Sequence, residues 1–232
     1  MRPAIAIFCL ILAGVVLAGM VSLHTPHPDP LQTDIDAAKA EADKAAEQAR
    51  PKTAGKAEDS KADPETKFDK VKTGAIRATL EIKGRGTIEM ELYPQAAPKT
   101  VAHILELANK NFWDGIKVHR AEAEVVQMGD PDSKDVKPDD FGLKGIGTHG
   151  SGATVPLEVS AQLPNIKYSL GLARTKEPDS GDSQFFINLM DNPTFDYDYC
   201  VFGRVVKGTA IVSQIQMGDV IKHFQVYENH PK

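Results

Sequence analysis

The sequence predicts a mainly β domain that carries two helices and follows an apolar N-terminal segment and a polar linker. Three observations support this prediction. Apolar and polar residues alternate over residues 76–92, which is the period of strands with one buried face. Apolar residues recur at helical spacing over residues 98–108. Residues 4–23 contain no charged side chain, whereas residues 24–70 are largely polar. Periodicity alone supports either an all-β or an α+β domain.

Length, charge and cysteine content narrow the class of protein. The 232 residues suffice for one domain of ordinary size and an extension. With a net charge of −5 the chain is not basic, so nothing indicates a nucleic acid as partner. The two cysteines, Cys9 and Cys200, lie far apart in segments of different character, and we expect no disulfide between them. The fold must therefore depend on its hydrophobic core.

The first 23 residues have the pattern of an export or membrane segment. An apolar run of about 20 residues is long enough to cross a bilayer as a helix, and residues 4–23 form such a run. Arg2 precedes it and no Lys or Arg follows before Lys39, so the positive-inside rule places the rest of the chain outside the cytoplasm. Residues 1–23 are then either a signal peptide, cleaved near residues 16–18, or an uncleaved signal anchor, which the length favours. We expect a membrane-anchored or secreted protein with a periplasmic or otherwise extracytoplasmic domain.

A polar linker rich in Ala, Glu, Lys and Pro spans residues 24–73. Strong helix formers at residues 34–50 can make a solvated helix, but that stretch has no apolar stripe to bury. Residues 51–65 have the composition of a disordered spacer. We therefore expect a tether that holds a globular domain, residues 74–232, away from a membrane surface.

The globular domain is expected to begin with a β-hairpin and a helix. Residues 76–82 and 87–93 each place apolar side chains on one face, and a glycine-containing turn at residues 83–86 joins them. Pro98 opens a helix, because the fixed φ of proline is tolerated in the first turn. Residues 111–115 end this helix, whose apolar face should pack on the sheet.

Short strands and a second helix follow. Residues 208–216 have the spacing of a helix, and a long loop rich in Gly, Asp, Lys and Pro occupies residues 129–152. Bounded apolar runs indicate further strands at residues 116–120, 125–128, 154–158, 168–173, 184–190, 199–206 and 219–228. Asp130, Asp132 and Asp135 in the long loop lack the twelve-residue pattern of a Ca²⁺ loop, so no metal site is expected. Many short strands with two helices are typical of an antiparallel barrel that helices cap.

Ten short stretches between residues 77 and 226 carry a family resemblance. They are Gly86–Tyr93, Ala97–Val101, Asp114–Gly115, His119–Arg120, Val125–Pro131, Gly147–Gly152, Val155–Glu158, Leu170–Arg174, Ser183–Ile187 and Val201–Val205. In this order they resemble the cyclophilin family of peptidyl-prolyl cis-trans isomerases, in its bacterial type. The resemblance implies a closed eight-stranded antiparallel barrel capped by two α-helices. It also implies isomerase activity on X-Pro bonds without a cofactor or a metal.

The implied reaction is rotation about an X-Pro amide bond. Amide resonance raises the barrier to this rotation to ~18–20 kcal/mol. A hydrogen-bond donor to the prolyl nitrogen weakens that resonance, and an arginine is always charged and offers a planar fork of donors. By the resemblance, Arg120 is this catalytic donor, and Gln127 orients it and contacts the substrate backbone. The step is electrostatic stabilisation of a twisted amide, without a covalent intermediate.

The resemblance also implies a substrate-binding surface around these two residues. Phe186 forms the floor of an apolar pocket for the proline ring. The other implied substrate contacts are the pocket wall at Val125, Phe195 and Tyr199, the strand that pairs with the substrate backbone at Ala173 and Arg174, the neighbouring pocket at Gly147 and Thr148, and Gln184 between the two pockets. Proline-containing polypeptides are the expected partners, and we expect the protein to be a monomer.

One segment departs from the family pattern. Residues 121–124 read Ala-Glu-Ala-Glu, one residue shorter than usual and without the aromatic residue that faces the proline pocket. Glu124 falls at or next to that aromatic position. Burying an isolated carboxylate is costly, so we expect Glu124 either to turn to solvent or to pair with Arg120. Pairing would occupy the catalytic donor.

Two functions of different classes therefore stay open. The first is a membrane-tethered isomerase that assists the folding of exported proteins, and the expected catalytic and pocket residues favour it. The second is a cyclophilin-like chaperone module that binds proline-containing segments with weak or no turnover. The shortened segment at residues 121–124 favours this second function.

Overall fold

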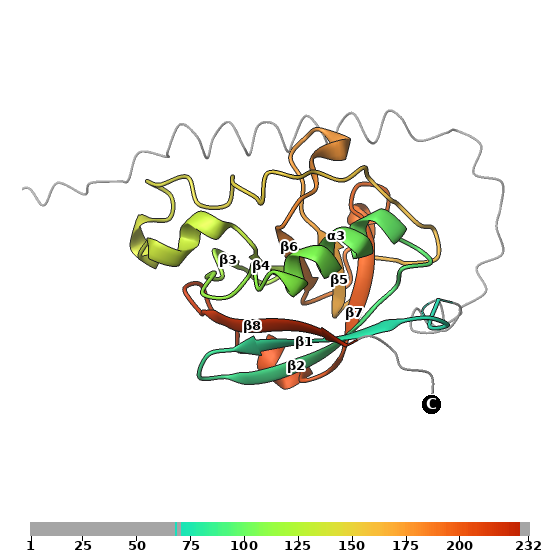
Figure 1. Ribbon diagram of the computed structural model, residues 1–232, viewed down its shortest axis with the longest axis horizontal. Helices are drawn as coiled ribbons and strands as arrows, with labels where there is room; N and C mark the ends of the chain where they lie inside the picture. The colour runs from blue at the N-terminus through green and yellow to red at the C-terminus, as the bar shows by residue number, and fades with distance from the viewer. Residues whose placement is uncertain (1–67, 69–70, 228–232) are drawn as a thin grey trace, which may run out of the picture. The chain divides into compact units, whose positions relative to one another are not determined.

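Within the part of the chain that the structure describes, eight strands form one antiparallel sheet (Figure 1). The computed structural model describes residue 68 and residues 71–227. The strands are β1 (Ile76–Ile82), β2 (Gly86–Leu92), β3 (Arg120–Ala121), β4 (Val125–Met128), β5 (Ser169–Leu172), β6 (Phe185–Asn188), β7 (Val201–Lys207) and β8 (Ile221–Tyr227). Their spatial order is β3-β4-β6-β5-β7-β2-β1-β8. The helix α3 (Pro98–Asn109) packs against β8, and the single-turn helix α4 (Thr209–Val212) packs against β2.

The first hairpin follows directly from the alternation of its side chains. β1 and β2 pair with Leu80 opposite Ile88, and in both strands the buried positions alternate with more exposed ones. Gly84 and Gly86 take φ values of +77° and +126°, which residues with a Cβ rarely adopt, so this turn needs glycine. The predicted hairpin is confirmed, with β2 shifted by one residue toward the N-terminus.

The helix α3 begins at Pro98, as predicted, and its N-terminus is stabilised from outside the helix. Proline has no N–H to donate, which suits the first helical turn. The backbone N–H groups of Lys99 and Thr100 donate to the carboxylate of Glu158, over 3.0 and 2.8 Å. This carboxylate satisfies two donors that a helix N-terminus leaves open and complements the helix dipole. The buried residues of α3 are Thr100, Val101, His103, Ile104, Leu107 and Ala108.

Aromatic rings dominate the core on the inner face of the sheet. Trp113 lies against Phe224 with ring centroids 4.7 Å apart, and it meets the ring of Phe185 edge-on at 5.9 Å. Phe185 also meets Phe202 edge-on. None of these four side chains is more than 1% exposed. Because Phe185 enters the core, the alternation of a strand places its neighbour Phe186 on the outer face.

Two predicted elements are shorter than expected. The strand predicted at residues 154–158 is wrong, because it is reduced to one bridge between Val155 and Gly181. Pro156 follows directly and has no N–H to donate to a ladder. The helix predicted at residues 208–216 is reduced to the single turn of α4, and hydrogen-bonded turns follow it.

The two edges of the sheet approach each other just before β3 and β8. The strand predicted at residues 116–120 pairs with β4 only from Arg120 on. Lys117 forms an isolated bridge to Val220, and the N–H of Val118 donates to the carbonyl of Asp219 over 2.8 Å. Among the described strands, the ladder runs from β3 to β8 without a pairing between those two. The sheet is therefore a curled one, and its closure into a complete barrel stays a prediction.

The predicted membrane or signal segment at residues 1–23 lies outside the described residues. The same holds for the linker, apart from residues 68 and 71–73. Phe68 and Val71 are buried in a small cluster, which they form with Tyr93, Leu163 and Val201. The folded domain therefore includes apolar residues that the sequence analysis assigns to the linker. Among the helices of the described residues, none is long and apolar enough to cross a membrane.

Replacing Phe68 with alanine should lower the free energy of unfolding by about 3–5 kcal/mol, the usual cost of removing a buried phenylalanine ring. The ring lies 5.7 Å from that of Tyr93 and 5.3 Å from the guanidinium of Arg204. Urea denaturation of the purified protein measures the change. Leu143→Ala is the control, because Leu143 is 87% exposed and should matter little. An unchanged midpoint for Phe68→Ala would show that residue 68 is not part of the cooperative domain.

Candidate active site

A row of four residues crosses the outer face of the sheet from β3 to β5. Arg120 lies opposite Gln127, and Gln127 lies opposite Phe186. Phe186 in turn lies opposite Gly171. Residues directly opposite each other in antiparallel strands share a face of the sheet, and the neighbouring Phe185 belongs to the core. The fold therefore brings the expected catalytic pair and the expected pocket floor side by side on the outer face.

The ring of Phe186 belongs to an aromatic cluster that lies over Gly171. A Cβ on Gly171 would lie 2.1 Å from Cζ of Phe186, so a side chain there would displace the ring. Phe195 and Tyr199 meet this ring edge-on, with centroids 5.9 and 5.5 Å away. Phe186 is 3% exposed, whereas the other two rings are half-buried. Val125, the third expected wall residue, is buried on β4.

Two cavities of the described domain lie away from this cluster. One of about 230 Å³ is lined by residues that include Phe68, Tyr168 and Arg204. The other, of about 430 Å³, lies against β1 and β2 beside Tyr227. Neither is lined by a residue of the Arg120 row or of the aromatic cluster. The apolar recess for a proline ring therefore stays a prediction.

Arg120 is held by an acidic neighbour. Its side chain is 37% exposed, and its Nη2 donates to Oε2 of Glu122 over 2.6 Å. This hydrogen bond raises the pKa of Arg120 above its ordinary value, against the opposing effect of partial burial. The charges of Glu122, Tyr199 and Glu124 raise it further. The guanidinium thus lies within electrostatic reach of Tyr199, which is one wall of the aromatic cluster.

The short β3–β4 turn uses a different glutamate from the one expected. Glu124 is exposed, which was one of the two expected outcomes. The expected alternative, an ion pair between Glu124 and Arg120, is not formed, because Glu122 makes that contact instead. The backbone carbonyl of Glu124 accepts the N–H of Leu189 over 2.7 Å, which ties the turn to the end of β6. One donor of Arg120 is nevertheless occupied by a carboxylate.

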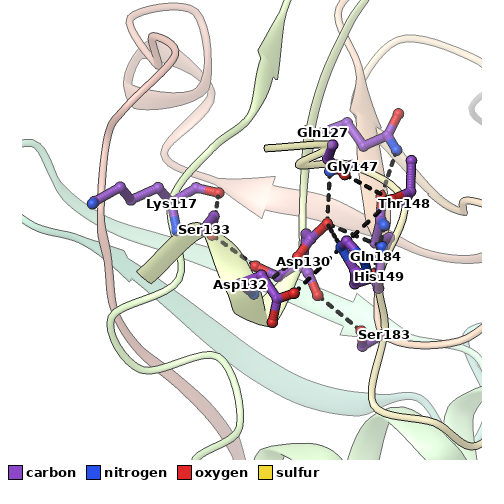
Figure 2. Close-up of polar contacts among 12 residues, drawn as sticks. Lys117, Gln127, Asp130, Asp132, Ser133, Gly147, Thr148, His149, Ser183 and Gln184 are labelled. Carbon is purple, nitrogen blue, oxygen red and sulfur yellow. Dashed lines mark hydrogen bonds and ion pairs between the residues drawn. The ribbon is translucent and has the colours of Figure 1, made fainter. Parts of the chain in front are cut away.

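Gln127 is held by a chain of side-chain amides. Its Nε2 donates to Oε1 of Gln184 over 2.9 Å, and Nε2 of Gln184 donates to the carbonyl of His149 over 2.7 Å (Figure 2). Gln184 therefore lies between the Arg120 row and the loop that carries Gly147 and Thr148. The expected role of Gln184 between two substrate pockets stays a prediction.

Arg174 and Ala173 contact other parts of the protein. The Nε of Arg174 donates to the carbonyl of Asp198 over 2.6 Å, and its guanidinium lies 5.2 Å from the centre of the Tyr199 ring. A cation over an aromatic face is attracted to it. The N–H of Ala173 donates to the carbonyl of Gln184 over 2.9 Å. These two residues thus support Tyr199 and Gln184, and their expected contact with a substrate backbone stays a prediction.

His119 lies between Arg120 and the loop at Gly147. Its Cδ2 lies 3.3 Å from the position of a Cβ on Gly147, where φ is +105°. Both ring nitrogens are buried without a hydrogen-bond partner. Burial lowers the pKa of His119 to about 4, although the Asp130 carboxylate acts in the opposite direction. The ring is therefore neutral at pH 7 and adds no charge beside Arg120.

Among the described residues, Asp130, Asp132 and His149 could together offer ligands to a metal ion, with donor atoms within 4.8 Å of one another. Both carboxylate oxygens of Asp130 already accept backbone N–H groups. Oδ1 accepts that of Asp132 over 2.9 Å, and Oδ2 accepts those of Gly147 and His149 over 2.6 and 3.1 Å (Figure 2). A cation would have to displace these donors, so the arrangement suits a structural carboxylate better than a metal ligand. Asp135 is not part of this cluster.

Sequence reasoning missed the contact of Glu122 and the contacts of Asp130. For Glu122 the signal was its spacing, because residues i and i+2 of an extended strand point to the same face, and Arg120 is two residues earlier. For Asp130 no local signal exists, since two of its partners lie 17 and 19 residues further along the chain.

Comparison with known proteins gives one consistent family. Residues 77–231 match the family described as "Cyclophilin type peptidyl-prolyl cis-trans isomerase/CLD". Peptidyl-prolyl cis-trans isomerase B of Bacillus subtilis is 35% identical over 140 residues, which cover 60% of this chain and 90% of that protein. Peptidyl-prolyl cis-trans isomerase A of Dickeya dadantii is 34% identical over 143 residues, which cover 58% of this chain and 70% of that protein.

Solved structures share the fold. The crystal structure of a cyclophilin-type isomerase from Cryptosporidium parvum covers 67% of this chain and 99% of its own, with a TM-score of 0.57 and 19% identity. A crystal structure of the same protein in the presence of the dipeptide Ala-Pro covers 66% of this chain, with a TM-score of 0.55 and 20% identity. At such identities the likeness supports the mainly β cyclophilin-like fold alone. Because the family match spans more than half of the sequence, the chain belongs to the cyclophilin-type peptidyl-prolyl cis-trans isomerase family.

Proposed function

We propose that Arg120 is the catalytic donor of this isomerase and that the aromatic cluster beside it receives the proline ring of a polypeptide. The observation that carries the proposal is the row across β3, β4 and β6, which puts Arg120, Gln127 and Phe186 on one face. The Cryptosporidium parvum structure determined in the presence of Ala-Pro supports a proline-containing ligand, since that dipeptide contains an X-Pro bond of the kind proposed here as substrate. Residues that flank the proline would then lie along Gln184 and the loop at Gly147.

In the proposed mechanism the amide twists while it is held against Arg120. Twisting takes the nitrogen lone pair out of conjugation with the carbonyl, and the nitrogen becomes a better hydrogen-bond acceptor. A guanidinium N–H directed at that nitrogen therefore stabilises the twisted state more than the planar one, and only such a difference accelerates a reaction. Gln127 holds the substrate backbone in place. The rings of Phe195 and Tyr199 contact the pyrrolidine and keep water from it.

Replacing Arg120 with alanine should lower kcat/KM for a proline-containing tetrapeptide about 10²-fold, the usual effect of removing one donor that stabilises a transition state. A protease-coupled cis/trans assay measures the rate. Arg77→Ala is the matched control, because Arg77 is an exposed arginine on β1 and should leave the rate unchanged. If Arg120→Ala isomerises the peptide as fast as the natural protein does, Arg120 is not the catalytic donor.

A second candidate function is a module that binds proline-containing segments with weak turnover. The ion pair between Arg120 and Glu122 favours it, because the carboxylate competes with a substrate for the same donor. Both side chains are more than one-third exposed, so solvent screens the pair. The competition is therefore expected to slow the reaction without abolishing it.

Replacing Glu122 with glutamine keeps the length of the side chain and removes its charge. Exposed ion pairs contribute about 0.2–1 kcal/mol, so releasing Arg120 should raise kcat/KM by up to about fivefold. Glu106→Gln is the control, since it removes a carboxylate from an exposed pair with Lys110 on α3. A lower kcat/KM in Glu122→Gln would mean that Glu122 orients Arg120 for catalysis, and the competition argument would then be wrong.

We further propose that the isomerase acts on exported proteins outside the cytoplasm, tethered or secreted through its N-terminal segment. The charge-free run at residues 4–23, with Arg2 before it and a polar linker after it, supports this placement. Fractionation of cells that express the full chain tests it. The domain should be recovered with membranes or outside the cytoplasm and should be digested by protease added to spheroplasts. Recovery in the soluble cytoplasmic fraction, protected from protease, would contradict the proposal.

A further inference from the structure

We propose that Asp130 is a positioning residue of this active site. Its buried carboxylate fixes the loop at residues 147–149 and, through that loop, the side-chain amides of Gln184 and Gln127. The inference rests on the proposed function, because it concerns how the catalytic side chains are placed. Asp130 is assigned no contact with the substrate.

The carboxylate of Asp130 is the fixed point of the network. Asp130 is 0% exposed, and a buried carboxylate is stable only when its charge is compensated. Three backbone N–H groups compensate it, those of Asp132, Gly147 and His149 (Figure 2). Hydrogen bonds to a charged acceptor are stronger than those between neutral groups. The loop at residues 147–149 is thereby attached to the end of β4.

The backbone around Asp130 is itself held tightly. A Cβ on Gly129 would lie 2.2 Å from the carbonyl oxygen of Ser183, so the backbone segments at Gly129 and Ser183 are in direct contact. Oγ of Ser183 donates to the carbonyl of Gly129 over 2.8 Å. The carbonyl of Asp130 accepts Oγ of Ser133 over 2.7 Å, and that Oγ accepts the N–H of Lys117 over 2.9 Å. Asp130 therefore keeps a set distance from the start of β6.

The second half of the network runs from the loop to the catalytic row. His149 donates its N–H to Asp130 and accepts Nε2 of Gln184 with its carbonyl, over 3.1 and 2.7 Å. Oε1 of Gln184 accepts Nε2 of Gln127, which lies opposite Arg120. A side-chain amide has a donor end and an acceptor end, so each of these bonds fixes the orientation of the next group. A displacement of His149 therefore reaches the amide that orients Gln127.

An asparagine at position 130 could not perform this role. The three backbone groups that hydrogen-bond the carboxylate are all donors, whereas asparagine has one acceptor oxygen and a donating NH₂ group. The NH₂ group would face an N–H of the loop or that of Asp132, and at least one bond would be lost. The rest of the side chain keeps its size. Asp130→Asn is therefore the substitution that tests the network rather than the packing.

The first experiment compares two loop variants in the cis/trans assay. Asp130→Asn should lower kcat/KM roughly tenfold, whereas Asp135→Asn should stay within about twofold of the natural protein. Asp135 is the matched control, because it is an exposed aspartate of the same loop and lies outside the network. No loss in Asp130→Asn would overturn the proposal. An equal tenfold loss in both variants would do the same, since it would show an effect of charge alone.

A double-mutant cycle then separates positioning from a general structural effect. Gln184→Met removes both side-chain bonds between the loop and Gln127. If Asp130 acts through Gln184, Asp130→Asn should cost at most about twofold in the Gln184→Met background, because coupled residues are not additive. A tenfold cost in both backgrounds would show that Asp130 acts by another route.

Two further measurements keep the result decisive. If Arg120→Ala is as fast as the natural protein, the proposed catalysis fails, and the cycle is run instead on the affinity for the proline tetrapeptide. Affinity requires no turnover, so a failure of the proposed catalysis can be distinguished from a failure of the proposed Asp130 network.

If Asp130→Asn does not fold, Gln184→Met alone is examined by NMR. The network requires the resonances of the His149 amide and the Gln127 side-chain amide to shift, and unchanged positions would overturn it.

Discussion

The register of β6 between β4 and β5 is the constraint on which the site depends. Consecutive residues of a strand face opposite sides of the sheet, so Phe185 enters the core and Phe186 faces outward. A slip of one residue would exchange the two rings. The contact of Phe185 with Trp113, 5.9 Å between centroids, therefore fixes the core and also the row that begins at Arg120. The free energy that stabilises the core thus also holds the geometry of the outer face.

Magnitudes favour the isomerase with Arg120 as donor over the binding module. The barrier of the X-Pro bond is ~18–20 kcal/mol, whereas an exposed ion pair such as that of Arg120 and Glu122 contributes about 0.2–1 kcal/mol. A contact of this size can change the rate a few-fold, but it cannot remove a donor from the reaction. Glu122 is better understood as a residue that moderates an isomerase than as one that converts the domain into a binding module. The exposure of both side chains supports this view, because a substrate can displace the carboxylate into water.

The parts of the fold that the sequence predicted are those specified by local patterns. The β1–β2 hairpin and α3 follow from alternation, glycines in a turn and Pro98 at a helix start, and all of these are visible within a few residues. The composition of residues 154–158 suits a strand, but a strand must also pair with a neighbour. Pro156 lacks the N–H that such pairing needs, so the segment forms a single bridge. Local pattern sets what a segment can form, and partners elsewhere in the chain decide whether it does.

In the site, too, some features follow from local sequence and others depend on partners elsewhere in the chain. The resemblance assigned Arg120, Gln127 and the aromatic cluster, and strand register brings them together. The bond from Glu122 to Arg120 depends on how a three-residue turn closes. The partners of Asp130 depend on how a long loop returns to the end of β4. The i, i+2 spacing of Arg120 and Glu122 is a local signal for the first contact, whereas no local pattern specifies the partners of Asp130.

Because the β3–β4 turn is short and has no aromatic residue, two other segments support the proposed site. This turn contributes no aromatic ring, so the aromatic part of the proposed pocket wall is left to Phe195 and Tyr199. Arg174 holds the side of these two rings, because it bonds the carbonyl of Asp198 and lies over the Tyr199 ring, with its own side chain 13% exposed. Asp130 holds the other side through the loop at residues 147–149. Each flank thus rests on one charged, largely buried side chain, and we expect the two to influence Arg120 by separate routes. A change at Asp130 should reach Arg120 through Gln127, and a change at Arg174 should reach it through Tyr199.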